Sequence, residues 1–270
     1  MRSIGYKSLF LGAVAVGLMV AGFPMDVAAG PSPNSAVIKE RVFNDCLTSV
    51  LTTTDNYPAL IAIDDDELDC VGFANRHNWR FSEDDTNPAV FNNGDSFRFC
   101  ATLTISGTAE GEAGLQISPW WSQDVDGVFN VRTTDGEIAC FGGRLPFYSF
   151  SGSHGLTYVK GTTIYLEMTY RANDNTAENP GTIEYQVTYN AVNYSSGEIA
   201  FDEGNPDEDP PYGVWGILND ARAGGHIQCF LQAGNPNAQL RAEWADICYE
   251  DLSPVPVQAT TWGKLKNLLD

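Results

Sequence analysis

Apolar and polar side chains alternate over short stretches along most of this chain. Over 113–118 the apolar residues occupy odd positions, and Phe129 and Val131 repeat the pattern after a turn at 122–127. A two-residue period is typical of a strand with one buried face, and Asp135-Gly136 favours a tight hairpin turn. The same alternation continues downstream, and no segment of the domain has a helical period. We therefore predict an all-β domain built from two antiparallel sheets.

The stretch 163–189 has the pattern of a β-hairpin. Apolar residues alternate over 164–170 and again over 183–189. Aligning the two apolar faces predicts that the numbers of facing residues sum to 353, which places Glu167 opposite Gln186 and Glu184 opposite Thr169. The two glutamates would then be diagonal neighbours on the polar face, about 7 Å apart. A separate first strand is predicted over 41–54.

The two ends of the chain have compositions unlike the domain. Residues 1–29 carry Arg2 and Lys7, an apolar stretch and then Val27-Ala28-Ala29, which is the pattern of a signal peptide cleaved after Ala29. We therefore predict secretion, with a domain over 30–252. Residues 253–270 read as a proline-rich linker followed by a short helix. This tail resembles the Thr-Trp-Gly-x-Leu-Lys endings of some exported bacterial proteins, which suggests surface retention through sorting machinery.

The chain is strongly acidic. Its formal charge is −20, and removing 1–29 takes away two basic residues and one acid, giving −21. Such a surface repels nucleic acid and anionic membranes, so neither is an expected partner. No run after residue 29 is long and apolar enough to span a bilayer, so membrane insertion is not expected either.

Six cysteines in an exported chain indicate disulfide bonds. Cys46 and Cys70 are the natural local pair. Strand parity turns Cys100 and Cys248 away from the core, and it turns Cys140 and Cys229 toward the core. We therefore predict the pairs Cys46–Cys70, Cys100–Cys248 and Cys140–Cys229, with free thiols as the alternative.

Several stretches, taken in order, resemble the concanavalin A-like lectin/glucanase superfamily, which includes laminin-G-like modules. They are 75–82, 97–105, 112–115, 161–164 and 245–247, and the likeness spans about 41–250. The resemblance implies a jelly roll of two curved antiparallel sheets, a concave face that often holds glycans and, frequently, a structural calcium ion. The superfamily contains lectins, glycanases and lyases, so the fold alone does not select an activity.

Candidate catalytic chemistry is sparse. Glu167 and Glu184 form the best carboxylate pair, although a retaining glycosidase needs about 5 Å between its two carboxyl groups. Residues 67–72 begin a glucanase-type E-x-D-x-x-E pattern but end in Gly72, and we reject them. Asp246 could join a calcium site as in calcium-binding relatives. No other cofactor is expected.

The sequence supports carbohydrate binding better than catalysis. A row of polar side chains on one face of three strands, flanked by aromatic rings, suits sugar hydroxyls and apolar sugar faces. The candidate residues are Gln116, Asn130, Arg132 and Glu137 for the row, and Trp121, Tyr212 and Trp215 for the rings. The alternative, that the tryptophans are core and the row is ordinary surface, stays open.

From these patterns we predict a secreted, non-catalytic carbohydrate-binding or adhesion module, with a glycan or polysaccharide as its partner. The alternatives are a glycanase or lyase that uses Glu167 and Glu184, or a structural surface protein with no small ligand.

Overall fold

A computed structural model of the chain describes residues 30–122, 125–204 and 213–253, without the side chains of 118–126. The predicted signal peptide (1–29) and all but the first residue of the predicted C-terminal tail (253–270) lie outside the described residues. The described residues group into one compact unit. Among the residues that the structure describes, no helix is long and apolar enough to cross a membrane.

The fold is the predicted all-β jelly roll of two antiparallel sheets, with seven strands each in the part of the chain that the structure describes. Sheet A has the order β1 (Ser35–Asn44), β4 (Ala74–Ser82), β13 (Arg222–Phe230), β6 (Gly111–Ser122), β7 (Val125–Arg132), β8 (Ile138–Phe141) and β9 (Tyr148–Ser149). Sheet B has the order β12 (Val192–Ala200), β11 (Thr182–Tyr189), β10 (Thr163–Arg171), β5 (Phe97–Ser106), β14 (Leu240–Asp251), β3 (Leu60–Asp66) and β2 (Val50–Asn56).

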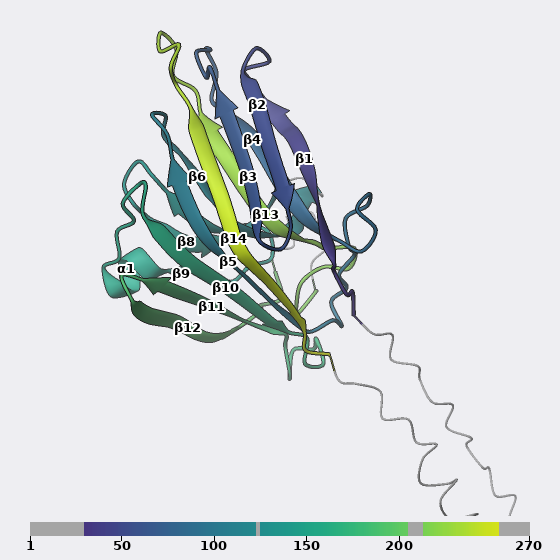
Figure 1. The fold of residues 1–270 in the computed structure, drawn as a ribbon. Coiled ribbons are helices and arrows are strands. Elements are labelled where there is room, and N and C mark those ends of the chain that lie inside the picture. Colours follow the sequence, from purple (N-terminus) through teal and green to yellow (C-terminus); the bar gives the residue numbers. More distant parts are fainter. Residues whose placement is uncertain (1–29, 123–124, 205–212, 254–270) are drawn as a thin grey trace, which may run out of the picture. The chain divides into compact units, whose positions relative to one another are not determined.

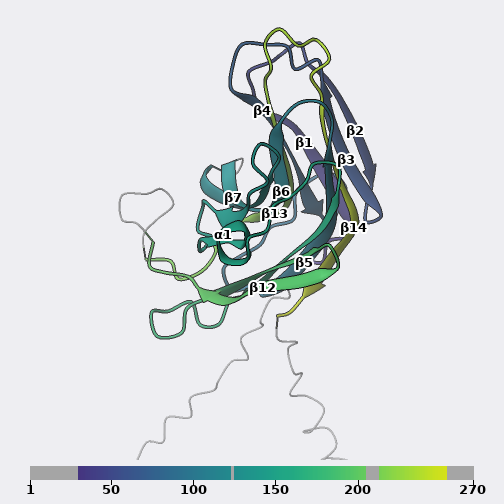
Figure 2. The same ribbon diagram turned by 90° about the vertical axis from the view of Figure 1, so that its left-hand side faces the viewer.

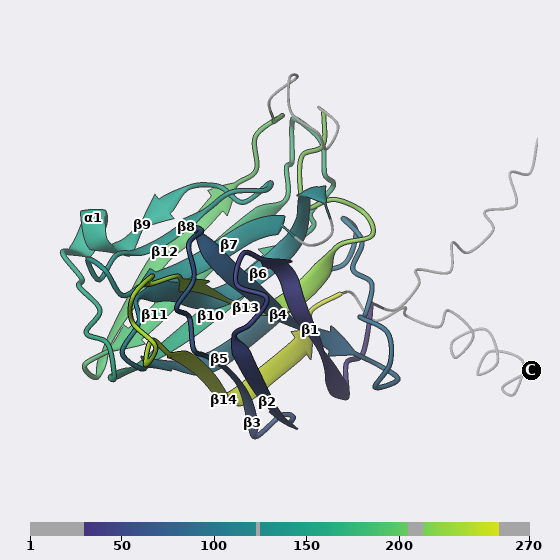
Figure 3. The ribbon, with the colours of Figure 1, turned by 90° about the horizontal axis from the view of Figure 1, so that it is seen from above.

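The two sheets form separate layers. The strands of sheet B run side by side from β12 to β14 in Figure 1. In Figure 2 they sweep in a curve along one side of the sheet A strands. Figure 3 shows the strands of sheet A following one another from β9 to β1. Sheet A therefore has one face turned toward sheet B and one turned away from it.

Aromatic side chains fill the space between the layers. Trp79 of β4 meets Trp244 of β14 edge to face, with ring centroids 6.1 Å apart, and Phe81 meets Phe99 of β5 at 5.6 Å. All four rings are fully buried. The Nε1–H of Trp244 donates to the carbonyl of Gly114 on the opposite sheet at 3.1 Å. These tryptophans are therefore core residues, and burial of such large rings stabilises the contact between the sheets.

The predicted hairpin is confirmed in register. Glu167 pairs with Gln186 and Glu184 pairs with Thr169, as the alignment of apolar faces required. The predicted first strand is wrong in its bounds, because a turn in which the amide of Ser49 donates to the carbonyl of Cys46 separates β1 from β2.

One short helix, α1 (Phe150–His154), was not predicted from the sequence. Ser149 caps its first turn by accepting from the amide of Gly152, and Gly155 ends it at φ 67°. Five residues are too few to display a helical period.

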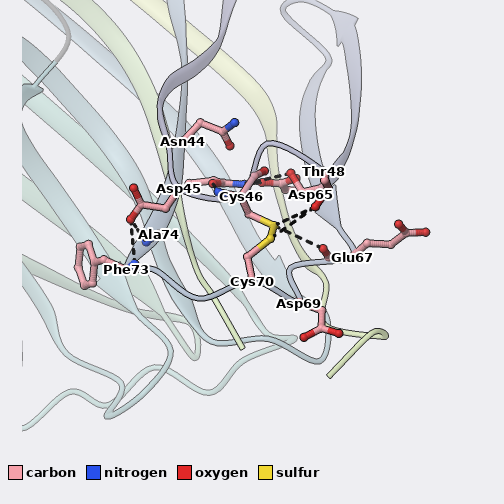
Figure 4. The surroundings of a disulfide bond; sticks show 12 residues. Asn44, Asp45, Cys46, Thr48, Asp65, Glu67, Asp69, Cys70, Phe73 and Ala74 are labelled. Atoms are coloured by element: carbon pink, nitrogen blue, oxygen red, sulfur yellow. Dashed lines mark hydrogen bonds between the residues drawn. A yellow bond between two sulfur atoms is a disulfide. The ribbon is translucent and has the colours of Figure 1, made fainter. Parts of the chain in front are cut away.

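Two of the three predicted disulfides are present. Cys46–Cys70 joins loops at the ends of β1 and β3, with Cα atoms 5.5 Å apart (Figure 4). Cys100–Cys248 joins facing residues of β5 and β14, with Cα atoms 5.0 Å apart.

The Cys140–Cys229 pair is wrong. Both thiols are buried and free. Parity correctly turned both side chains toward the core, but β6 and β7 lie between their strands. Three inter-strand steps span about 14 Å, whereas a disulfide needs Cα atoms within about 7 Å.

Candidate functional site

The face of sheet A turned away from sheet B carries a dense group of polar side chains, which we call the polar face. It consists of Arg76, Asn78 and Arg80 of β4, His226 and Gln228 of β13, Glu112 and Gln116 of β6, and Asn130 and Arg132 of β7.

Strand alternation explains why these residues gather on one face. On β4, Trp79 and Phe81 point into the core between the sheets, so the intervening Arg76, Asn78 and Arg80 point the other way. Register then places the polar groups beside one another across strands. Gln228 faces Glu112, and Gly224 faces both Arg80 and Gln116.

The polar face is unusual because most of it is buried. Arg76, Asn78, Arg80, Gln116, Asn130, His226 and Gln228 are each at most 9% exposed. Polar groups on the outward face of a sheet are normally solvated, and burying them without hydrogen bonds costs free energy. Their burial here therefore requires a connected network.

Glu112 lies at the centre of that network. Its two carboxylate oxygens accept from Asn130 Nδ2 at 2.8 Å and from Gln228 Nε2 at 3.1 Å. Asn130 Oδ1 in turn lies 3.2 Å from His226 Nε2. On the neighbouring side, Arg76 Nη2 donates to Gln116 Oε1 at 3.1 Å.

The buried polar atoms of this face that form no hydrogen bond include Nε2 of Gln116, a donor, and Nδ1 of His226. Burial and the positive charge of Arg76 hold the pKa of His226 well below its ordinary value, so the ring is neutral at pH 7. Buried polar atoms that form no hydrogen bond are rare in folded proteins and are often associated with function.

The predicted polar row is partly brought together. Gln116 and Asn130 both belong to the polar face. Arg132 lies at its edge and is bound by two carboxylates, Asp135 at 2.6 Å and Glu137 at 2.7 Å. The Arg132 guanidinium holds the pKa of Asp135 at about 2. Arg132 and Glu137 therefore brace the β7–β8 turn.

The role of the three predicted aromatic rings stays a prediction. The side chains of Trp121 and Tyr212 lie outside the described residues. Trp215 is half-buried in the loop before β13, and its carbonyl accepts from the amide of Gly181 at 2.7 Å.

The predicted carboxylate pair lies on sheet B, on the face turned away from sheet A. Glu167 is nearly buried and accepts from the hydroxyl of Tyr165 at 2.6 Å. Glu184 accepts from Ser195 Oγ at 2.6 Å and from Gln186 Nε2 at 3.0 Å. The pair is therefore separated from the polar face by both sheets, and its catalytic role stays a prediction.

A second buried polar cluster lies between the sheets. Asp65 Oδ2 lies 2.7 Å from Asn75 Nδ2 and 3.0 Å from His77 Nε2, and the thiol of Cys229 is nearby. His77 Nδ1 accepts from the amide of Arg41 at 2.9 Å, so the ring proton must sit on Nε2. That nitrogen has no lone pair left for a metal ion, and the cluster is therefore a hydrogen-bond network.

The calcium site that the resemblance implies stays a prediction. Calcium needs six to eight oxygen ligands, whereas the cluster at Asp65 offers nitrogen and sulfur. Asp246 is exposed on a bulge of β14 at φ 51°. Among the described residues it belongs to no group of three potential ligands.

Sequence reasoning missed most of the polar face. Arg76, Asn78 and Arg80 lie in 75–82, which the sequence singles out only as part of a resemblance, and His226 was not predicted as a site residue. The signal was present in 75–81, where polar residues alternate with Trp79 and Phe81. Once Trp79 is assigned to the core, Arg76 and Arg80 must share the opposite face.

No family model matches this chain, and no curated protein matches its sequence. Among solved structures it is similar to a polysaccharide lyase family 7 alginate lyase at 12% identity and a TM-score of 0.43, covering 80% of this chain and 94% of that one. An alginate lyase from Klebsiella pneumoniae has 9% identity and a TM-score of 0.46, over 74% and 84%. A functionally unknown protein from Saccharomyces cerevisiae has 11% identity and a TM-score of 0.40, over 78% and 100%. At this level of similarity, none of them assigns a function to this chain.

Proposed function

We propose that the protein binds an acidic polysaccharide through the polar face of sheet A. The observation that carries the proposal is the unfilled donor, Nε2 of Gln116, buried beside the Arg76 guanidinium. Guanidinium and amide N–H groups in a shielded site bind carboxylates by short, charge-assisted hydrogen bonds. A uronic acid unit presents such a carboxylate together with hydroxyls, and a hydroxyl can donate to Nδ1 of His226.

The strong negative charge of the chain does not prevent this interaction. Charges more than about 8 Å apart are largely screened at physiological salt, so the field at the site depends on its own charged groups, the cations Arg76 and Arg80 and the single carboxylate of Glu112. Because Gln116 and His226 are shielded from solvent, neighbouring side chains must move aside before a ligand reaches them. We therefore expect slow association, as is usual when binding requires rearrangement.

Titration with alginate and with polygalacturonate tests the proposal, using neutral dextran as the comparison. Arg76→Met should weaken acidic-glycan binding about 10- to 100-fold, the value of one or two lost hydrogen bonds to a charged group. Arg171→Met is the matched control, because it makes the same change of net charge on sheet B, where Arg171 pairs with Glu198. Thermal melting should show that both variants are folded.

Equal losses in the two variants would mean that only net charge matters, and no binding of either acidic glycan by the parent protein would contradict the proposal. Inert results throughout would favour a structural surface protein.

Cleavage of the same polysaccharide is a second candidate function. It is favoured by the neutral ring of His226, whose Nδ1 has no partner. In a β-elimination the base takes the proton from the carbon next to the carboxylate, that electron pair forms a carbon–carbon double bond, and the glycosidic C–O bond breaks, its oxygen taking a proton from water. Arg76 and Gln116 would stabilise the charge that develops on the carboxylate.

The ultraviolet absorbance of the unsaturated product measures this cleavage. His226→Asn should slow it about 10²- to 10⁴-fold, as loss of a general base does. Glu184→Gln, on the other sheet, should leave it unchanged. The opposite pattern, with reducing ends released by the parent and abolished only in Glu184→Gln, would instead establish the carboxylate pair on sheet B as the catalytic site.

A further inference from the structure

Glu112 has a position from which it determines the hydrogen-bonding state of His226 without touching it. A carboxylate only accepts hydrogen bonds. Its contact at 2.8 Å must therefore come from the NH₂ group of Asn130, which directs the carbonyl oxygen Oδ1 of Asn130 toward His226. An amide without such a neighbour could be turned either way.

The oriented amide then decides which ring nitrogen of His226 carries the proton. Asn130 Oδ1 is an acceptor 3.2 Å from Nε2, so Nε2 must be the N–H donor. Since the ring is neutral, Nδ1 keeps its lone pair, and this is the atom without a partner.

The backbone carbonyl of Leu115 opposes this assignment of the His226 proton to Nε2. It raises the pKa of His226 against the lowering by burial and Arg76, and a contact with Nδ1 would favour a proton there. However, no hydrogen bond of acceptable geometry forms at Nδ1. A proton there would also leave Nε2 as an acceptor, so the Asn130 amide would have to turn its oxygen toward the Glu112 carboxylate. The carboxylate prevents that arrangement.

We propose that Glu112 is a positioning residue that acts through Asn130 to keep the Nδ1 lone pair of His226 free for the ligand. This deepens the proposed function and rests on it for its biological meaning. The predicted ligand group at this point is a hydroxyl or another hydrogen-bond donor, because Nδ1 can only accept.

Nitrogen-15 spectroscopy of the histidine rings tests the proposal on the intact folded protein without glycan. The chain has only three histidines, so spectra of His226→Asn assign the signal of interest. In the parent protein, that signal should be of the Nε2–H tautomer. In Glu112→Gln an NH₂ group replaces one carboxylate oxygen. Wherever it lies, it faces the NH₂ group of either Asn130 or Gln228, and one of those two amides must turn its oxygen toward residue 112. The tautomer should then become mixed.

The matched control is the double variant Glu112→Gln with Gln228→Glu. The new carboxylate at 228 accepts from the NH₂ group at 112, so the oxygen at 112 again faces Asn130 and the Nε2–H tautomer should return. An Nδ1–H tautomer in the parent, or a single Nε2–H tautomer in Glu112→Gln, would overturn the proposal. These results do not depend on any glycan being bound. If the tautomer behaves as expected, Glu112→Gln should also weaken alginate binding severalfold relative to the double variant, and equal affinities would show that the free lone pair serves no ligand.

Discussion

Reduction of the two disulfides should unfold the domain. By loop entropy, Cys100–Cys248 closes a loop across 148 positions and contributes about 5 kcal/mol, while Cys46–Cys70 closes one across 24 and contributes about 3.5 kcal/mol. Domains of this kind are stable by only about 5–15 kcal/mol in total. The reduced chain should therefore lose most or all of its free energy of unfolding. Denaturant titrations with and without reductant, followed by tryptophan fluorescence, measure the loss.

The number of cysteines that react with an alkylating agent tests the disulfide assignment directly. The folded, oxidised protein should react with no alkylating agent, because Cys140 and Cys229 are fully buried and burial raises the pKa of each thiol well above its ordinary value. After denaturation without reductant, two thiols should react. Zero reactive thiols would establish a third bridge and contradict the strand order of sheet A. Replacing Cys100 and Cys248 together by alanine should cost more stability than replacing Cys46 and Cys70.

Side-chain parity predicted which face each residue occupies better than it predicted which residues meet. It correctly aligned the hairpin of β10 and β11, and it correctly turned Cys100 outward and Cys140 inward. Parity carries no information on strand order, however. Cys140 and Cys229 point into the same core, yet two strands separate them. Long-range strand order depends on connections between distant segments, which a local two-residue period does not encode.

The same limit explains the candidate site. Gln116 and Asn130 are on adjacent strands joined by a hairpin, so the local pattern could bring them together. Arg76 and His226 enter the sheet from strands far apart in the sequence, since β13 lies between β4 and β6. Burial was also unpredictable from alternation alone, because polar residues at outward positions normally indicate solvent. The network centred on Glu112 depends on tertiary contacts that are not visible in any single strand.

Replacing Asp65 by asparagine should destabilise the domain by about 3 kcal/mol. The carboxylate is fully buried and lies at hydrogen-bond distance from both Asn75 and His77, and hydrogen bonds to a charged group are worth about 1.5–3 kcal/mol each. Both donors contact Oδ2 of Asp65, whereas Oδ1 has no partner. The amide oxygen of asparagine would accept from the same donors without a negative charge, so these hydrogen bonds should weaken. The effect should extend to the first disulfide loop, because Asn75 Oδ1 also accepts from the amide of Cys46 at 2.9 Å.

Asp64→Asn is the matched control. Asp64 precedes Asp65 on β3, is nearer the surface, and pairs with Arg241 over an N–O distance of 3.5 Å. It should cost about 1 kcal/mol or less.

The destabilisation by Asp65→Asn should itself depend on pH. Burial alone would raise the pKa of Asp65, but its hydrogen bonds, led by that of His77, lower it below the ordinary value of 3.8. A carboxyl group whose pKa is lower in the folded state contributes its stability above the unfolded pKa and loses it as pH falls through the folded pKa. The gap in unfolding free energy between the parent and Asp65→Asn should therefore be constant near neutral pH and shrink as the pH falls below about 4. A gap that widened in acid would mean that Asp65 is protonated in the folded state, and the direction of hydrogen bonding from His77 would then have to be reversed.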